Sequence, residues 1–322
     1  MLDFIRSIFE PNRAHDDAGG YSLEYLETTS SPQWPSQPSQ ARAIVVGIGG
    51  CGKNAVQYLH DKLPPAIGLF WLVQEPGQPL SAWRQDTNAS SPQLLGHGES
   101  VFRQIMSGIE TLYLICGLGG SVGSDFSLKL VRLASALSIK THALVTMPFA
   151  FEGTRVTAAR KALDQLTEET TTCMVFHNDE LRAMLSGQAT LEYAFTLHKL
   201  WLTHTLLCLQ QISEVGLLDG LGQGNRLCMG FGRSDDPNQI ERTIEVALKC
   251  PLLPHGVLHQ ANRAFLLLGT ATTLPSAAVT QAGISAKAQL ASIPVINVQA
   301  QRDSRMNGDL YVTCLLIYGA PP

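Results

Sequence analysis

The chain has 322 residues, of which 45% are hydrophobic and 16% charged, and its formal net charge is −4. This length allows a sizeable core and two domains. The slightly negative charge and the lack of a long basic run exclude nucleic acid as an expected partner.

The seven cysteines are scattered singly, and the nine histidines form no spacing typical of metal ligands. Isolated cysteines in apolar or glycine-rich surroundings suit reduced thiols in a cytosol. No apolar run reaches the roughly 18 residues of a membrane span, and the first residues do not resemble a secretory signal. We therefore predict a cytoplasmic protein, with membrane association left open, and no metal site.

The first ten residues have helical periodicity. Their apolar residues fall on one face, and Pro11 ends the pattern. This amphipathic helix either docks on a protein surface, its own or a partner's, or lies on a membrane. Membrane-surface helices usually carry a basic polar face, which this one lacks. Residues 12–40 are rich in Ser, Pro and Gln, so residues 1–40 are expected to form a helix plus a flexible linker.

From residue 41, expected strands and helices alternate, which predicts an α/β fold with a doubly wound, mostly parallel sheet. The expected strands are 43–46, 68–73, 111–116, 141–147 and 172–176. The expected helices are 53–61, 101–108, 125–137 and 154–170. Residues 76–100 are predicted to be irregular, and the domain is expected to span 41–187.

A long helix is predicted over residues 190–212, within a central segment 188–212. It is apolar nearly all round, as in helices buried between two bodies. The remaining residues, 213–322, predict a smaller α+β domain. Its expected strands and helices are 226–232, 237–249, 264–270, 276–290, 294–301 and 310–319.

Two glycine-rich loops each follow an expected strand and open an expected helix: "GIGGCGKNAV" from Gly47 and "GLGGSVGS" from Gly117. Backbone N–H groups in such loops, together with helix N-termini, donate hydrogen bonds to phosphate oxygens. The pair therefore predicts one anion held from two sides.

The first loop alone also fits the dinucleotide fingerprint G-x-G-x-x-G, with Glu75 at the end of the next strand as a ribose-binding acid. This alternative, an NAD-binding oxidoreductase, leaves the second loop unexplained and identifies no acid or base for a substrate.

Several motifs resemble those of the FtsZ/tubulin superfamily, and FtsZ more closely than tubulin. The first loop looks like GxGGxGxNAV, the second resembles GGGTGTG, and "VTMPFAFEG" is similar to VTxPFxFEG. "HND" at 177–179, "YAF" at 193–195 and "MGFGRSDDPNQIERTIEVALKCPLL" from Met229 follow in family order. The resemblance runs from about residue 41 to residue 319 and implies a nucleotide domain, a central helix and a smaller C-terminal domain.

The resemblance also implies binding of GTP or GDP and head-to-tail filaments of the chain with itself. Glycines would meet the phosphates, Glu152 and Arg155 the ribose, and Asn54, Asn178 and Phe195 the guanine. Without such a role, the two asparagines would simply cap turns. The implied nucleotide-binding residues are Gly49, Gly50, Cys51, Asn54, Gly119, Gly120, Ser121, Gly123, Ser124, Glu152, Arg155, Asn178 and Phe195.

Two departures from the family affect nucleotide binding. The family reads guanine with an acid four residues after the stacking phenylalanine, and that position is Lys199. An ammonium group has only donors and cannot accept the guanine N–H groups. Asp125 replaces the glycine that ends the second loop motif. Its carboxylate would either repel phosphate or face sideways and cap the helix.

Further departures affect hydrolysis and coupling to partners. The family's catalytic loop, NxDxxD, corresponds to "GLLDGLGQGN" from Gly216, where Leu221 and Gly224 replace the two acids that polarise the attacking water. "QEP" from Gln74 stands in place of NTD, and the next phosphate loop is shortened to "GHGES". The family's C-terminal adaptor-binding tail has no counterpart, so coupling to division adaptors is not expected.

The sequence therefore predicts an FtsZ-like cytoskeletal or scaffold protein, hydrolysis-deficient and without catalytic residues, acting in membrane remodelling or cell division. One alternative is an active polymerising GTPase that uses non-standard residues, and the other is the NAD-binding oxidoreductase. Whether the site holds GTP, GDP or no nucleotide stays open. The expected partners are further copies of the chain and, through residues 1–10, a membrane or another protein.

Overall fold

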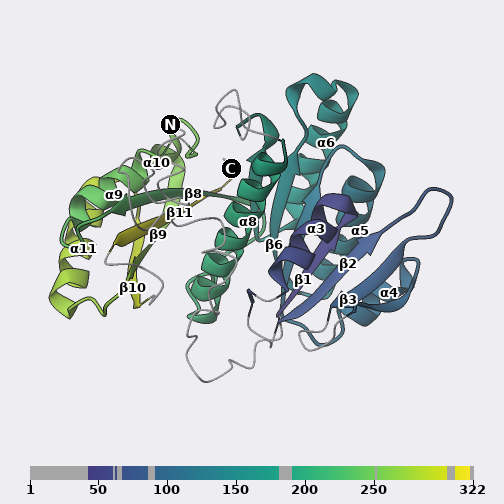
Figure 1. Ribbon diagram of the computed structural model, residues 1–322, viewed down its shortest axis with the longest axis horizontal. Helices are drawn as coiled ribbons and strands as arrows, with labels where there is room; N and C mark the ends of the chain where they lie inside the picture. Colours follow the sequence, from purple (N-terminus) through teal and green to yellow (C-terminus); the bar gives the residue numbers. More distant parts are fainter. Residues whose placement is uncertain are drawn as a thin grey trace, which may run out of the picture. The chain divides into compact units, whose positions relative to one another are not determined.

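The computed structural model describes residues 43–60, 62–63, 67–85, 91–180, 191–250, 252–302 and 309–319. The helix predicted at residues 1–10 and the linker at 12–40 lie outside them. The chain forms two compact units (Figure 1), the larger comprising residues 34–183 and 188–226 and the smaller including residues 227–322. Within the described residues, no helix combines the length and apolarity needed to span a membrane.

The larger unit contains a sheet with strand order β7-β6-β5-β1-β2-β3-β4. Five strands are parallel, and their middle residues are buried on both faces, as expected when helices cover both sides of a sheet. This confirms the predicted α/β fold with a mostly parallel sheet. These strands are β1 (Ala43–Ile48), β2 (Gly68–Val73), β5 (Thr111–Gly117), β6 (Lys140–Met147) and β7 (Thr172–His177).

The prediction of an irregular segment at 76–100 was wrong. It contains two antiparallel strands, β3 (Ser81–Gln85) and β4 (Gln93–His97), which extend the sheet beyond β2. Trp83 pairs with Trp71 of β2, and their stacked rings lie 6.5 Å apart. Each strand has only five residues, and the register shifts between Ala82 and Trp83, so the apolar alternation is too short to stand out in the sequence.

In the larger unit, helices alternate with the parallel strands along the chain. A π-helical turn, η1 (Val122–Phe126), lies between β5 and α5, where the sequence predicted one continuous helix from residue 125. A 3₁₀ turn, η2 (Ala150–Glu152), precedes α6. The α-helices are α3 (Gly49–Leu59), α4 (Ser100–Ile105), α5 (Ser127–Ala136), α6 (Thr154–Glu169) and α8 (Leu191–Glu214).

Helix α8 runs opposite to the parallel strands. Near its start, His198 lies 3.3 Å from the Thr146 hydroxyl, close to the carboxyl end of β6. After its end, Asp219 lies 2.5 Å from Lys140, the first residue of β6. The helix therefore begins at the carboxyl edge of the sheet and ends at the amino edge.

The smaller unit has a four-stranded sheet in the order β10-β9-β11-β8. Strands β9 and β11 are antiparallel and almost fully buried, and β10 pairs with β9 in parallel. Helix α9 buries Ile240, Ile244 and Ala247, one apolar stripe at helical spacing. The elements are β8 (Asn225–Ser234), α9 (Ile240–Leu248), α10 (Val257–Gln260), β9 (Ala261–Thr270), α11 (Ser276–Gln289), β10 (Val295–Arg302) and β11 (Leu310–Gly319).

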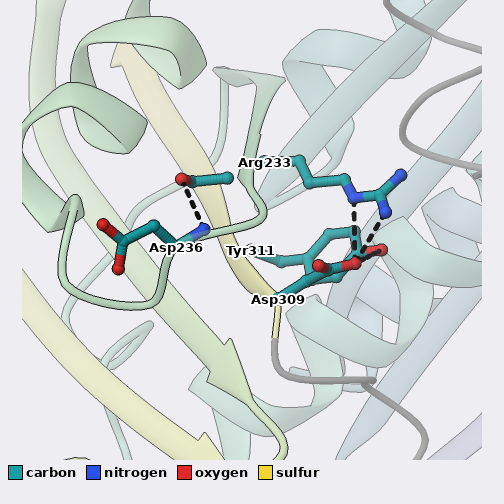
Figure 2. Close-up of polar contacts among 5 residues, drawn as sticks. Arg233, Asp236, Asp309 and Tyr311 are labelled. Atoms are coloured by element: carbon teal, nitrogen blue, oxygen red, sulfur yellow. Dashed lines mark hydrogen bonds and ion pairs between the residues drawn. The ribbon is translucent and has the colours of Figure 1, made fainter. Parts of the chain in front are cut away.

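An ion pair joins β8 to the chain just before β11 (Figure 2). Arg233 donates through Nε and Nη2 to one carboxylate oxygen of Asp309, at 3.1 and 2.6 Å. Its guanidinium also lies 5.6 Å from the ring of Tyr311. Beside it, the Ser234 hydroxyl accepts a hydrogen bond from the Asp236 backbone, which shapes the turn before α9. These contacts are structural, because they tie the ends of two core strands together.

Candidate functional site

The two glycine loops lie side by side at the carboxyl edge of the larger sheet. They follow β1 and β5, which are adjacent strands, with Ile48 in register with Cys116. A methyl group added to Gly49 would lie 3.9 Å from the backbone nitrogen of Gly123 in the other loop. The structure therefore brings the two sequence motifs together around one small volume.

Glycine is required at particular positions of these loops. Gly119 has φ +90°, and a Cβ there would lie 2.7 Å from the carbonyl oxygen of Arg155. A Cβ on Gly123 would lie only 1.9 Å from the carbonyl oxygen of Gly117. By contrast, a Cβ added to Gly50 or Gly120 would meet no atom within 4 Å.

Ser124 shapes the second loop from within. Its side-chain oxygen accepts a hydrogen bond from the backbone N–H of Gly119 at 3.1 Å, and its own N–H donates to the Gly120 carbonyl at 3.0 Å. The residue is buried, whereas Ser121 is exposed at the tip of the loop. The Ser124 hydroxyl is thus already engaged in positioning the glycines.

Cys51 connects the first loop to the central helix. Its thiol donates to the Thr146 hydroxyl at 3.7 Å, and Thr146 in turn lies 3.3 Å from Nε2 of His198. Burial raises the pKa of the Cys51 thiol, and burial lowers the pKa of His198 to about 4. Both groups are therefore neutral at pH 7. Sequence reasoning missed this chain of contacts, because its three members lie far apart in the sequence and match no spacing rule.

Glu152 and Arg155 engage each other. One carboxylate oxygen of Glu152 accepts from the Phe149 backbone at 2.8 Å, and the other contacts the Arg155 guanidinium. The Ala150 backbone donates to Asp179 at 2.7 Å, so the segment before α6 is fixed to the end of β7. Phe151, stacked on Phe149, is 73% exposed at this edge. Any ribose contact by Glu152 would have to share the carboxylate with Arg155.

The residues predicted to meet a base lie at the same edge. Asn178 follows the end of β7, and its side-chain oxygen is buried without a hydrogen-bond partner among the described residues. Asn54 is exposed within α3, whose first residue is Gly49, so it does not cap that helix. Phe195, in the first turns of α8, is 46% exposed.

Asp125 lies in the first turn of η1, beside the second loop, and is exposed. Among the described residues, no hydrogen bond or ion pair involves its carboxylate. No contact among the described residues therefore supports the interpretation that Asp125 faces sideways and caps the helix. Its negative charge lies next to the loop that would approach a phosphate.

The loop after α8 lies at the opposite, amino edge of the sheet. Besides the pairing of Asp219 with Lys140, the Gln223 amide donates to the Ser135 hydroxyl at 2.9 Å and to the Glu169 carbonyl at 3.1 Å. The backbone N–H of Gly224 donates to the Thr170 carbonyl at 2.9 Å. The loop from Gly216 to Asn225 is therefore held against the larger unit, at the edge of the sheet opposite to the glycine loops.

Comparison of the chain with known proteins agrees with this geometry. Residues 81–186 match the tubulin/FtsZ family, GTPase domain. The cell division protein FtsZ of Wigglesworthia glossinidia brevipalpis is 25% identical over 301 residues, 85% of this chain and 78% of that protein. FtsZ of Neisseria meningitidis serogroup B is 28% identical over 262 residues, 73% of this chain and 67% of that protein.

Solved structures give the same fold. An FtsZ dimer from M. jannaschii superposes with a TM-score of 0.70 at 20% identity, covering 92% of this chain and 90% of that one. CetZ2 from Haloferax volcanii, solved as a GTPγS-bound protofilament, superposes with a TM-score of 0.63 at 16% identity, covering 85% of this chain and 92% of that one. The fold and the paired glycine loops thus define an FtsZ-like α/β protein. The chain is similar to divergent FtsZ proteins, and its residues 81–186 match the GTPase domain of the tubulin/FtsZ family.

Proposed function

We propose that this protein is an FtsZ-like filament-forming protein whose subunits stack head to tail through the two edges of the larger unit. One observation carries the proposal: the glycine loops lie at the carboxyl edge, and the loop from Gly216 to Asn225 lies at the amino edge of the same sheet. Stacking in one direction would place the loop from Gly216 to Asn225 of one subunit over the glycine loops of the next.

Nucleotide binding at the glycine loops belongs to the same proposal. Its support is the donor set: backbone N–H groups of two loops, with Gly50 and Gly120 facing open space, suit an anion. The buried oxygen of Asn178, which has no partner among the described residues, suits an N–H group of a base. The family match and the CetZ2 protofilament with its bound nucleotide favour GTP or GDP. The NAD alternative gains no support from any of these observations.

We further propose that hydrolysis is deficient. Leu221 and Gly224 carry no carboxylate to polarise water, and the carboxylate of Asp219 is occupied by Lys140. Gly224 also has φ +86° and donates its N–H to Thr170. An acid introduced at Gly224 would cost about 1 kcal/mol or more in backbone strain, so Leu221 is the better position for restoring a carboxylate.

Phosphate release from GTP tests this proposal when it is measured at increasing protein concentration, together with sedimentation of assembled protein. We expect sedimentation to increase with concentration while turnover stays near background. Leu221→Asp should raise turnover only under conditions in which the protein sediments, and Leu221→Asn, of similar size but uncharged, should not. Wild-type turnover that climbs with concentration would instead support the active GTPase that uses non-standard residues. Failure to sediment at any concentration would refute filament formation.

The third part of the proposal concerns attachment. The amphipathic pattern of residues 1–10 and the linker-like composition of 12–40 support a role in membrane remodelling or cell division, in which the first ten residues hold the assembly on a membrane or a partner protein.

A further inference from the structure

We propose that Lys199 sets the base preference of the nucleotide site: it selects against the 2-amino group of guanine and favours a purine that carries an oxygen at that position. The inference rests on the proposed nucleotide binding and concerns which purine the site prefers. Lys199 has no carboxylate partner in the described part of the chain. None of the ion pairs or hydrogen bonds found there includes it.

The position of Lys199 is fixed by contacts between two helices. Its ammonium group lies 5.4 Å from the centre of the Tyr58 ring, at the end of α3. Helices α3 and α8 both begin at the carboxyl edge of the sheet and run toward the amino edge, so the two helices have the same direction. The residues one turn earlier, Asn54 and Phe195, therefore both lie closer to the glycine loops than the pair of Tyr58 and Lys199 does.

Asn178 lies at the same level of the site. Phe176 contacts His198 and Trp201 of α8, with ring centres 5.3 and 4.8 Å apart. Asn178 comes two residues later, just after the end of β7, so the chain has advanced by at most roughly 7 Å, which compares with roughly 5.4 Å for one turn along α8. Asn178 is thus brought to the level of Phe195, one helical turn above Lys199.

These groups offer a base one aromatic face, one buried acceptor and one cation. A ring stacked on Phe195 can donate one N–H to the free oxygen of Asn178. Guanine carries two neighbouring donors on that edge, the N1–H and the 2-amino group. The second donor would face the ammonium of Lys199, which can only donate, so guanine gains nothing from its amino group here.

A purine with an oxygen at carbon 2 reverses this relation. Xanthine presents an acceptor where guanine presents a donor, and its ring loses a proton near neutral pH, which adds an attraction to the lysine cation. Hypoxanthine, with only hydrogen at that carbon, should fall between the two. The expected order of affinity is therefore XDP, then IDP, then GDP, with about a tenfold difference between XDP and GDP.

Calorimetric titration of the full chain with GDP, IDP and XDP tests the inference without relying on hydrolysis. Lys199→Glu supplies an acceptor and should reverse the order, with GDP binding most tightly. Lys199→Met removes the charge alone and should abolish the XDP preference. Lys62→Glu is the matched control, because the Lys62 ammonium also lies over the Tyr58 ring, at 4.2 Å, but outside α3 and further from the glycine loops. That variant should keep the wild-type order.

The outcomes separate the inference from the proposed function. Wild-type preference for GDP over XDP, or an order that Lys199→Glu and Lys199→Met both leave unchanged, would overturn the role of Lys199 while leaving nucleotide binding intact. A reversal that Lys62→Glu also produces would show a general charge effect and would equally overturn it. If no diphosphate binds to the wild type, the nucleotide part of the proposed function fails and this inference fails with it.

Discussion

Single residues distinguish the candidate site from the family motifs that the sequence resembles. Asp125 places a carboxylate beside the second glycine loop without a partner among the described residues, and Glu152 and Arg155 are bound to each other. Each feature lowers the affinity expected for a polyphosphate. In the proposed nucleotide site, the charge of Asp125 would act through repulsion, and the Glu152–Arg155 pair would occupy the groups that the resemblance assigns to the ribose.

Removing the charge of Asp125 should tighten nucleotide binding. Asp125→Asn keeps the size of the side chain, and we expect the affinity for GDP to rise about two- to fivefold at low salt, since the carboxylate is exposed and screened. The gain should shrink as salt is added. Asp164→Asn, which neutralises an exposed acid on α6, is the control and should have no effect. Calorimetry measures both variants. Tight wild-type binding that Asp125→Asn leaves unchanged would remove Asp125 from the explanation.

At the scale of elements, the contacts of Cys51, Thr146 and His198 couple helix α8 to the carboxyl edge of the sheet, where the glycine loops lie. His198 is buried, and burial lowers its pKa to about 4. In the unfolded chain the pKa returns to roughly 6.5. Between these values the unfolded state binds a proton that the folded state does not, so the free energy of unfolding falls as the pH drops from about 6.5 toward 4.

His198→Gln should weaken that pH dependence. We expect the loss of stability between pH 7 and pH 5 to be smaller in the variant by about 1–2 kcal/mol, as measured by urea unfolding at both values. Some loss should remain, because burial also lowers the pKa of His142 to about 4. Substitution of an exposed histidine, His255→Gln, should leave the dependence unchanged. An equal loss in wild type and His198→Gln would contradict the buried neutral state of His198.

The elements also show what the sequence could predict. The parallel strands and glycine loops were predictable because each is a local signal, an apolar run followed by a turn that only glycine permits. Strands β3 and β4 were missed because their alternation is short and interrupted by a register shift. The contacts of Thr146 with Cys51 and His198 join residues 95 and 52 positions apart, and the pairing of Asp219 with Lys140 spans 79. Such pairings depend on the tertiary fold, which single-sequence patterns do not encode.

The molecule as a whole combines two folded units with an N-terminal segment of amphipathic pattern. Burying the apolar face of residues 1–10 against a membrane or another protein would contribute several kcal/mol at about 25 cal/mol per Å². A linker-like stretch of almost thirty residues would let that face reach well away from the folded units.

Liposome flotation should therefore separate the full chain from a variant that begins at Gln40. We expect the full chain to float with the vesicles and the shortened protein to remain at the bottom. Replacement of Phe4 and Phe9 by serine in the full chain is a milder variant that should also lose flotation. Equal flotation of full and shortened chains would exclude the membrane role. If their oligomeric sizes also agree, the partner role is excluded as well.

The opposite placement of the glycine loops and the loop from Gly216 to Asn225 has a consequence for how assembly could be stopped. A stack built from such subunits has two chemically different ends, one showing glycines and the other showing Asp219 and its neighbours. A subunit damaged at only one edge could still bind the end of a filament through its intact edge. The damaged edge would then offer no binding surface to the next subunit. Small amounts of such a one-sided subunit would act as a terminator, shortening filaments far out of proportion to their number.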